Sequence, residues 1–258
     1  MLKWVKTKIS EAIITYLEQP AWRYRPFSLM TAEKLLPHLK PGDVLLVEGN
    51  QRISSIIKYL TQSTWSHACF YVGDSIGFDE NGEMLCLIEA SAKGGVNAVP
   101  LSKYNHFNSR ICRPSGLNKS EKKKVVQFIV SKIGLQYDMK NIIDLMRYLF
   151  PYPPVPIFYR RRMLALGSGD PTRAICSTLI AQAFQSLKYP ILPKIELTQI
   201  QSKNASYQEI ELYHIRHHSL FTPRDFDVSP YFKIIKPTIE NGFKFKEMRW
   251  ANDQNTKE

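Results

Sequence analysis

The segment that most constrains the fold of this chain is an apolar helix predicted to begin at Cys176. Its apolar side chains recur at three- and four-residue spacing and share one face: Leu179, Ile180, Ala183, Phe184 and Leu187. A run of breakers at 167–171 precedes the segment, so Cys176 falls in the first helical turn. Unpaired backbone N–H groups and the positive end of the helix dipole meet in that turn. Both favour a thiolate, the nucleophilic form of cysteine, so the remaining question is whether the chain supplies a base.

Short apolar runs separated by turns predict a β-sheet in the first half of the chain. A turn at 41–43 precedes the first run, and the predicted strands cover 44–47, 67–72, 85–90, 96–101 and 109–113. A short amphipathic helix is predicted over 53–60. A longer helix is predicted from Asn118, where Glu121 can close a capping box, to a stop at Gly134. Further helices are expected before residue 40 and after Asp138, and short pieces are expected beyond Leu187.

The composition indicates a globular protein that keeps its cysteines reduced. Of the 258 residues, 44% are hydrophobic and 12% are aromatic, which is enough for a substantial core. The four cysteines form no CxxC pair, which disfavours a cysteine-based zinc site: Cys69, Cys86, Cys112 and Cys176. Lysines and Glu11 interrupt the N-terminus, so no secretory signal is predicted and we expect a cytoplasmic chain. No cofactor is expected.

The net charge of +12 predicts attraction to an anionic partner. No motif for binding RNA or DNA is present, so a membrane face or an acidic substrate is favoured over nucleic acid. An apolar stripe with flanking lysines could lie on an anionic bilayer, although such a stripe more often packs on its own domain. Its members are Trp4, Val5, Ile9, Ile13 and Tyr16. No apolar run reaches about 18 residues, so any membrane contact would be peripheral.

The stretch 150–173 differs in composition from the rest of the chain. It contains several prolines, which forbid regular structure, and then mixes apolar and basic side chains. A long connection of this kind is typical of a functional loop. We therefore predict a lid over the site that Cys176 faces.

Two residues on the predicted strands are candidates for a base and for the group that orients it. His67 begins the second strand, directly after the Ser/Thr-rich turn at 62–66, where a side chain can face a cleft. Glu89 lies near the end of the third strand in an apolar setting, so its carboxylate needs a partner. If the two strands are neighbours, Glu89 can accept the imidazole N–H of His67. Taken alone, a histidine on a strand is more often a structural residue.

Three histidines close together in the sequence, His214, His217 and His218, raise the alternative of a metal site. The cationic Arg216 among them disfavours a bound cation. Apart from two nearby glutamates, no carboxylate or cysteine with ligand spacing stands beside them. No metal site is predicted.

Short motifs occur in a fixed order along the chain, at 40–44, 66–73, 88–90, 134–138, 176–180 and 222–226. Together they resemble the circularly permuted papain-fold amidases of the YiiX/YaeF-like group. That group is distantly similar to NlpC-type cell-wall hydrolases and to lecithin–retinol acyltransferase-like enzymes. The resemblance implies an α+β, circularly permuted papain-like fold, with an antiparallel sheet packed against helices and the nucleophile at a helix N-terminus. It divides the chain into a helical extension over 1–39, a catalytic domain over 40–235 with the insertion at 150–173, and a tail over 236–258.

The resemblance also gives each candidate side chain a role. Cys176 is the nucleophile, His67 the general base and acid, and Glu89 the polar group that orients the imidazole. Tyr137 lines the site, where its hydroxyl can help to hold an oxyanion beside the backbone N–H of Cys176. Asp138 either lines the site as well or only caps the helix that follows.

Cys69 is a departure from that group, whose members often carry glycine two residues after the histidine. Strand alternation puts Cys69 on the same face as His67. We predict that it lines the pocket mainly as a packing residue, because it lacks the helix N-terminus that activates a thiol. A second reactive thiol is the alternative.

The sequence therefore predicts a thiol hydrolase or acyltransferase that cleaves an amide or acyl bond through a thioester on Cys176. Its substrate is an acyl or peptide compound. The basic charge and the insertion favour a lipid or lipidated substrate at a membrane face, as a phospholipase or N-acyltransferase would use. The alternative is a non-catalytic papain-like module that binds an anionic membrane or protein, with Cys176 merely buried.

Overall fold

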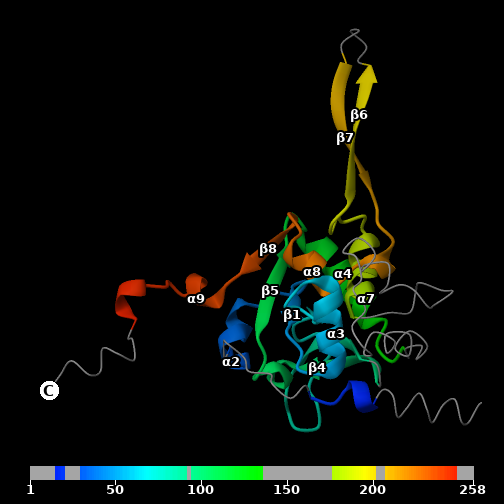
Figure 1. Ribbon diagram of the computed structural model, residues 1–258. Coiled ribbons are helices and arrows are strands. Elements are labelled where there is room, and N and C mark those ends of the chain that lie inside the picture. Colours follow the sequence, from blue (N-terminus) through cyan, green and yellow to red (C-terminus); the bar gives the residue numbers. More distant parts are fainter. Residues whose placement is uncertain (1–14, 21–29, 92–93, 136–175, 202–206, 249–258) are drawn as a thin grey trace, which may run out of the picture.

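The centre of the molecule is a six-stranded antiparallel sheet with the strand order β4-β3-β2-β1-β5-β8 (Figure 1). The computed structural model describes residues 15–20, 30–91, 94–135, 176–201 and 207–248. The strands of this sheet are β1 (Val44–Val47), β2 (His67–Tyr71), β3 (Leu85–Ser91), β4 (Gly95–Pro100), β5 (Ser109–Pro114) and β8 (Phe232–Ile235). The first five confirm the strands predicted from the apolar runs, and their ends lie within one residue of the prediction.

Strand β1 is buried on both faces, which is why its four residues are all apolar. Val44 and Leu46 face a core that includes helices α4 (Lys119–Val130) and α7 (Cys176–Gln185). Leu45 and Val47 face a second core, formed with α2 (Ala32–Leu35) and η2 (Leu101–Tyr104). The sheet is therefore the middle layer of an α+β fold.

Shorter elements lie between or beside these layers: η1 (Leu36–His38), α3 (Arg52–Thr61), η3 (His218–Leu220) and α8 (Pro223–Asp227). After β8, the helices α9 (Pro237–Glu240) and η4 (Phe245–Glu247) extend away from the sheet (Figure 1). Helix α3 confirms the amphipathic helix predicted over 53–60. In the helical region expected before residue 40, the described part forms a short helical piece at 15–17, α2 and η1, whereas most of the N-terminal apolar stripe lies outside the described residues. Among the described helices, none has the length and apolar character needed to cross a bilayer.

Helix α4 has the predicted capping box. The side chain of Asn118 accepts from the backbone N–H of Glu121, and the side chain of Glu121 accepts from that of Asn118, each at 2.9 Å. The helix ends at Val130, earlier than the predicted stop at Gly134. The reason is tertiary, because the backbone N–H of Gly134 donates to the carbonyl of Val96 in β4 at 2.9 Å. This bond holds the chain against the sheet rather than on the helix axis.

Helix α7 begins at Cys176, as predicted, and packs on β2. Its ring Phe184 is fully buried, and the ring centroid lies 6.0 Å from that of Phe70 in β2. One residue after the helix start, the hydroxyl of Ser177 donates to the carbonyl of Phe221 at 2.8 Å. The packing and this bond together fix the position of the helix start against the sheet.

A long β-hairpin leaves the body of the molecule (Figure 1). Strand β6 (Lys194–Gln201) pairs with β7 (Tyr207–His214), from Lys194 opposite His214 to Gln201 opposite Tyr207. Each strand has eight residues, so the expectation of short pieces beyond Leu187 fails for this segment. Among the described strands, these two pair with each other and not with the six-stranded sheet, and no long apolar run marks them in the sequence.

A buried ion pair joins the start of β1 to β5. Asp43 is 1% exposed, and its carboxylate accepts from Nε and Nη2 of Arg113 at 2.9 and 2.7 Å. The backbone N–H of Lys40 donates to the same carboxylate at 2.8 Å. Burial raises the pKa of Asp43, and the hydrogen bond and charge of Arg113 oppose that rise. The guanidinium is therefore what makes the buried carboxylate tolerable.

Replacing Arg113 should destabilise the protein strongly. We expect Arg113→Leu to lower the free energy of unfolding by about 3–5 kcal/mol, because it leaves a carboxylate buried without its counter-charge. Urea unfolding at pH 7 measures the loss. The matched control Lys123→Leu removes an exposed cation of α4 and should change stability by less than about 0.5 kcal/mol. A loss below about 1 kcal/mol for Arg113→Leu, as for a surface pair, would contradict this role.

Candidate active site

The thiol of Cys176 touches the strand that carries His67, although 108 residues separate the bonded groups along the chain. The backbone N–H of Ala68 in β2 donates to Sγ of Cys176 at 3.2 Å. Cys176 is 3% exposed, at the first position of α7. The start of α7, which carries the predicted nucleophile Cys176, therefore contacts β2, the strand that carries the predicted base His67.

His67 is held at the entry to β2 by a close approach of two loops. It lies opposite Val47, the last residue of β1. Just before it, the hydroxyl of Ser66 accepts from the backbone N–H of Gly49 at 2.9 Å. A Cβ on Gly49 would lie 2.3 Å from the hydroxyl of Ser54 and 3.0 Å from that of Ser66, so a larger residue at position 49 would force these side chains to move. The side chain of His67 remains 23% exposed, whereas that of Glu89 is 4% exposed.

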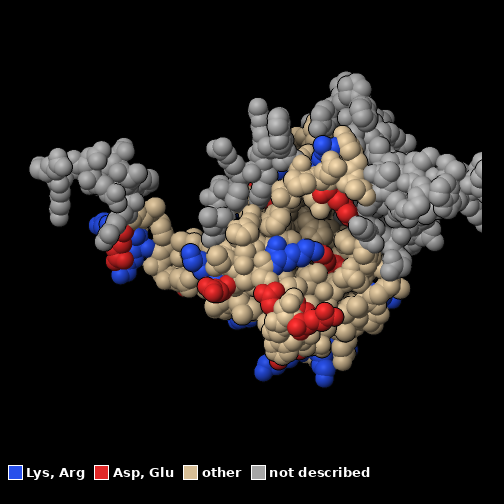
Figure 2. All heavy atoms as spheres, turned by 90° about the horizontal axis from the view of Figure 1, so that it is seen from below, with Lys and Arg blue, Asp and Glu red and all other residues tan. Residues whose placement is uncertain are grey.

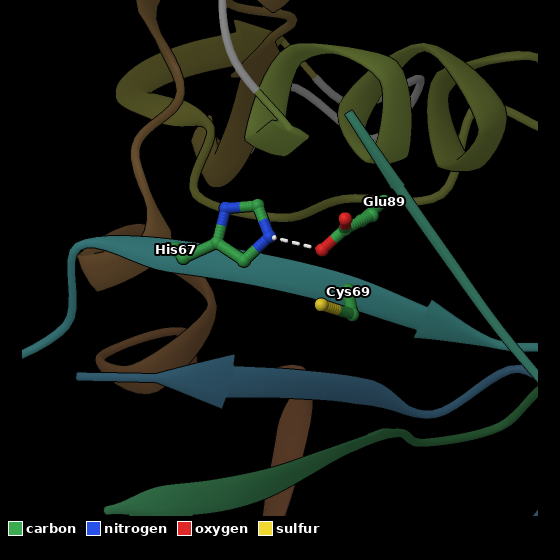
Figure 3. A group of neighbouring side chains, drawn as sticks. All are labelled: His67, Cys69 and Glu89. Carbon is green, nitrogen blue, oxygen red and sulfur yellow. Dashed lines mark hydrogen bonds and ion pairs between the residues drawn. The ribbon is translucent and has the colours of Figure 1, made fainter. Parts of the chain in front are cut away.

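The imidazole of His67 lies between a thiol and a carboxylate. Its Nε2 is 3.1 Å from Oε2 of Glu89, and an ionised carboxylate only accepts, so Nε2–H is the donor (Figure 3). The other ring nitrogen points to the side on which α7 lies (Figure 3). Cys176 is close enough to His67 to contribute to raising the pKa of the imidazole. Because β2 and β3 are neighbours in the sheet, the condition that the sequence set for the His67–Glu89 contact is met.

The carboxylate of Glu89 accepts two further donors that the sequence did not indicate. The ammonium of Lys103 bonds its Oε1, and the hydroxyl of Tyr104 donates to its Oε2. Strand register pairs Glu89 with Asn97, so the strand pattern would have placed Asn97 beside it. Lys103 and Tyr104 belong to η2, which packs against the sheet near Glu89. No pattern in the sequence predicts this contact.

The protonation of the cluster follows from these contacts. Burial alone would raise the pKa of Glu89, but the hydrogen bond and charge of His67, together with Lys103, lower it to about 2. Burial alone would lower the pKa of His67, but the charges and hydrogen bonds of Cys176 and Cys69 raise it well above its ordinary value. The arrangement therefore favours an imidazolium beside an ionised carboxylate.

Cys69 lies beneath His67 and is fully buried. Its thiol donates to the hydroxyl of Tyr104 at 3.3 Å, and burial raises its pKa despite the nearby imidazole. The ligand atoms of His67, Cys69 and Glu89 lie within 4.8 Å of one another, close enough to be considered for a metal ion. Hydrogen bonds to Tyr104 and Lys103 already account for this arrangement, so we assign no metal to it.

The remaining predicted site residues and the three histidines of the rejected metal site are considered separately. Tyr137, Asp138 and the insertion at 150–173 lie outside the described residues. Of the three histidines weighed as metal ligands, His214 pairs with Glu196 at 3.0 Å. The rings of His217 and His218 stack with centroids 4.1 Å apart.

Comparison with known protein families gives a match over part of the chain. Residues 38–150 match the family of the permuted papain-like amidase enzymes, YaeF/YiiX, C92 family. The matched stretch contains His67 and Glu89, and Cys176 follows it. A search of curated proteins gives no match.

Among solved structures, the fold is similar to the crystal structure of metalloprotein yiiX from Escherichia coli O157:H7, with 16% sequence identity and a TM-score of 0.44. That alignment covers 76% of this chain and 96% of the other. The family match confirms the resemblance that the motifs indicated: the chain is similar to the permuted papain-like amidases of the YaeF/YiiX group, a family of cysteine-hydrolase type.

Proposed function

We propose that this protein is a thiol hydrolase in which Cys176 attacks the carbonyl carbon of an amide or ester. His67 is its base and acid, and Glu89 orients the imidazole. The observation that carries this assignment is the 3.2 Å contact of Cys176 Sγ with the backbone of β2, next to an imidazole held by a carboxylate at 3.1 Å. The family match over 38–150 supports an amidase or peptidase type of reaction.

The proposed reaction has two halves. The ring nitrogen of His67 that faces α7 takes the proton of the Cys176 thiol, and Sγ adds to the carbonyl carbon. The tetrahedral intermediate collapses, His67 gives the proton to the departing amine or alkoxide, and a thioester remains. Water or another acceptor, deprotonated by His67, then attacks the thioester and releases the acyl product and the thiol. Glu89 stays ionised throughout and stabilises the imidazolium.

An oxyanion forms in both halves and needs donors. The backbone N–H of Cys176, at the start of α7, is one candidate, because the first N–H groups of a helix have no partner within it. Tyr137 is proposed as the second donor on the resemblance alone. If Tyr137 acts in this way, its hydroxyl binds the oxygen more strongly in the intermediate than in the substrate.

The substrate proposed here is an acyl group of a lipid or a lipidated compound, at an anionic membrane face. The net charge of +12 supports it, as does the mixture of apolar and basic residues at 150–173. The face in Figure 2 carries basic and acidic side chains together around a hollow, so the excess positive charge is not gathered into one patch there. Transfer to an acceptor rather than to water is the variant of the same chemistry.

Selective alkylation tests the nucleophile directly. Iodoacetamide at pH 7, followed by peptide mapping, should label Cys176 at least about tenfold faster than Cys86 or Cys112. Burial raises the pKa of both of those thiols, whereas Cys176 lies beside an imidazole. Equal labelling of the three thiols, or none, would favour a binding module without catalysis.

Incubation with phospholipid vesicles tests the substrate. Mass spectrometry of the intact protein should detect an added acyl chain, and peptide mapping should place it on Cys176. Cys176→Ser should lose the thioester adduct, with an unchanged circular dichroism spectrum. If vesicles leave no adduct while a peptide amide does, the enzyme is an amidase and the lipid assignment is wrong.

Glu89→Gln should slow alkylation of Cys176 at pH 7 by about 10²-fold or more, since a misoriented imidazole is a poor base.

The same substitution, Glu89→Gln, should also change the pH dependence of the free energy of unfolding. The folded pKa of about 2 lies below the ordinary value of 4.5, so Glu89 stabilises the fold above pH 4.5 and loses that effect as the pH falls towards 2. Its size is on the order of 3 kcal/mol. Urea unfolding at pH 7 and pH 3 should show a smaller difference for the variant than for the wild type, and equal differences would remove this role of Glu89.

A further inference from the structure

The carboxylate of Glu89 is held from three sides. Lys103 bonds Oε1, while His67 and Tyr104 both donate to Oε2. The hydroxyl of Tyr104 in turn accepts from the thiol of Cys69 at 3.3 Å. Two of these donors belong to η2, an element that the proposed reaction does not use, and they leave the carboxylate no free direction in which to turn.

We propose that Lys103 and Tyr104 are positioning residues that keep the Glu89 carboxylate ionised and aim its Oε2 at His67. Through His67, they set the reactivity of the Cys176 thiol, although neither is placed on the substrate. This role rests on the proposed function, because it matters for reactivity only if Cys176 is the nucleophile. It assigns to η2 the task of aligning the base.

Tyr104 supplies the geometric part of this role. It is 5% exposed, and its ring is fixed by neighbours on two sides. The ring centroid of Phe107 lies 5.8 Å away at an interplanar angle of 72°, and that of His67 lies 6.2 Å away. A hydroxyl on a fixed ring can bond Oε2 in one position only. The same oxygen therefore cannot rotate away from the imidazole.

Lys103 supplies the electrostatic part. Its side chain is 44% exposed, so its ammonium keeps much of its hydration while Glu89 is only 4% exposed. The cation therefore compensates a buried charge without being buried itself. The groups that face Glu89 are His67, Lys103, Tyr104 and Cys69, and Lys103 is the one that is cationic independently of the reaction. Without it, the buried carboxylate would rely on an imidazolium that must lose its proton in each cycle.

The test needs no substrate. The rate of Cys176 alkylation by iodoacetamide is measured against pH, and a carbon-detected NMR titration follows the Glu89 carboxyl in the same proteins. Lys103→Met should slow alkylation at pH 7 about tenfold, move the acidic limb of the profile to higher pH, and raise the Glu89 pKa by about one unit or more. Lys103→Arg should restore the rate to within about twofold, because it returns the cation.

Tyr104→Phe keeps the ring and removes only the hydroxyl. It should slow alkylation about tenfold at pH 7 while leaving the circular dichroism spectrum unchanged. The matched control is Lys123→Met, an exposed lysine of α4 outside the cluster, which should behave as the wild type. The positioning role would be overturned if Lys103→Met and Tyr104→Phe changed only the free energy of unfolding. In that case the alkylation rate against pH and the titration of Glu89 would both match the wild type.

The two readouts separate this role from the proposed function. If Cys176 of the wild type is not alkylated selectively, the nucleophile is wrong, yet the NMR titration still decides whether Lys103 and Tyr104 hold Glu89 ionised. If Cys176 is alkylated selectively but at the same rate in Lys103→Met and Tyr104→Phe, the assignment of the nucleophile is kept and the positioning role is refuted.

Discussion

The site depends on the seating of α7 on β2. One end of this contact is polar, where the backbone N–H of Ala68 meets the Cys176 thiol at 3.2 Å. The rest is apolar, led by the buried ring of Phe184 against Phe70. The hydrophobic contact sets where the helix lies, and the hydrogen bond sets where the sulfur points. Without the first, the second could not hold, because a single such bond stabilises a contact by only about 1 kcal/mol.

A second constraint is the carboxylate beneath the imidazole. Glu89 is almost fully buried, and an isolated charge at that depth would take a proton instead. Three donors make the ionised form the favoured one, and one of them is the imidazole of His67. Glu89 and His67 therefore stabilise each other, and the two donors of η2 stabilise Glu89 further. The charged residue Glu89 inside an apolar strand is tolerated because Lys103 and Tyr104, which follow the next strand, bond its carboxylate.

The site is assembled from distant parts of the chain. The family match covers 38–150, which includes the strands of His67 and Glu89, and the helix of Cys176 comes later. The hairpin β6–β7 and the segment with α9 and η4 leave the body, as Figure 1 shows. The described contacts of Cys176, His67 and Glu89 do not involve them.

Much of the secondary structure follows from the sequence alone. The apolar runs specified five strands of the sheet to within one residue, the capping pair Asn118 and Glu121 specified the start of α4, and the periodicity after the breakers placed Cys176 at a helix start. These are local signals, since a strand, a cap or a helical face is read from neighbouring residues. The sequence could also name His67 and Glu89 as partners, but only on the condition that their strands are adjacent.

Only the tertiary structure decided that condition, and it decided what surrounds the pair. Lys103 and Tyr104 reach Glu89 because η2 folds back under the sheet, whereas the register alone would have chosen Asn97. Likewise, α4 ends early because Gly134 bonds a strand rather than its own helix. In each case the determining interaction joins residues whose nearness depends on the packing of the whole chain, and spacing along the sequence does not encode that nearness.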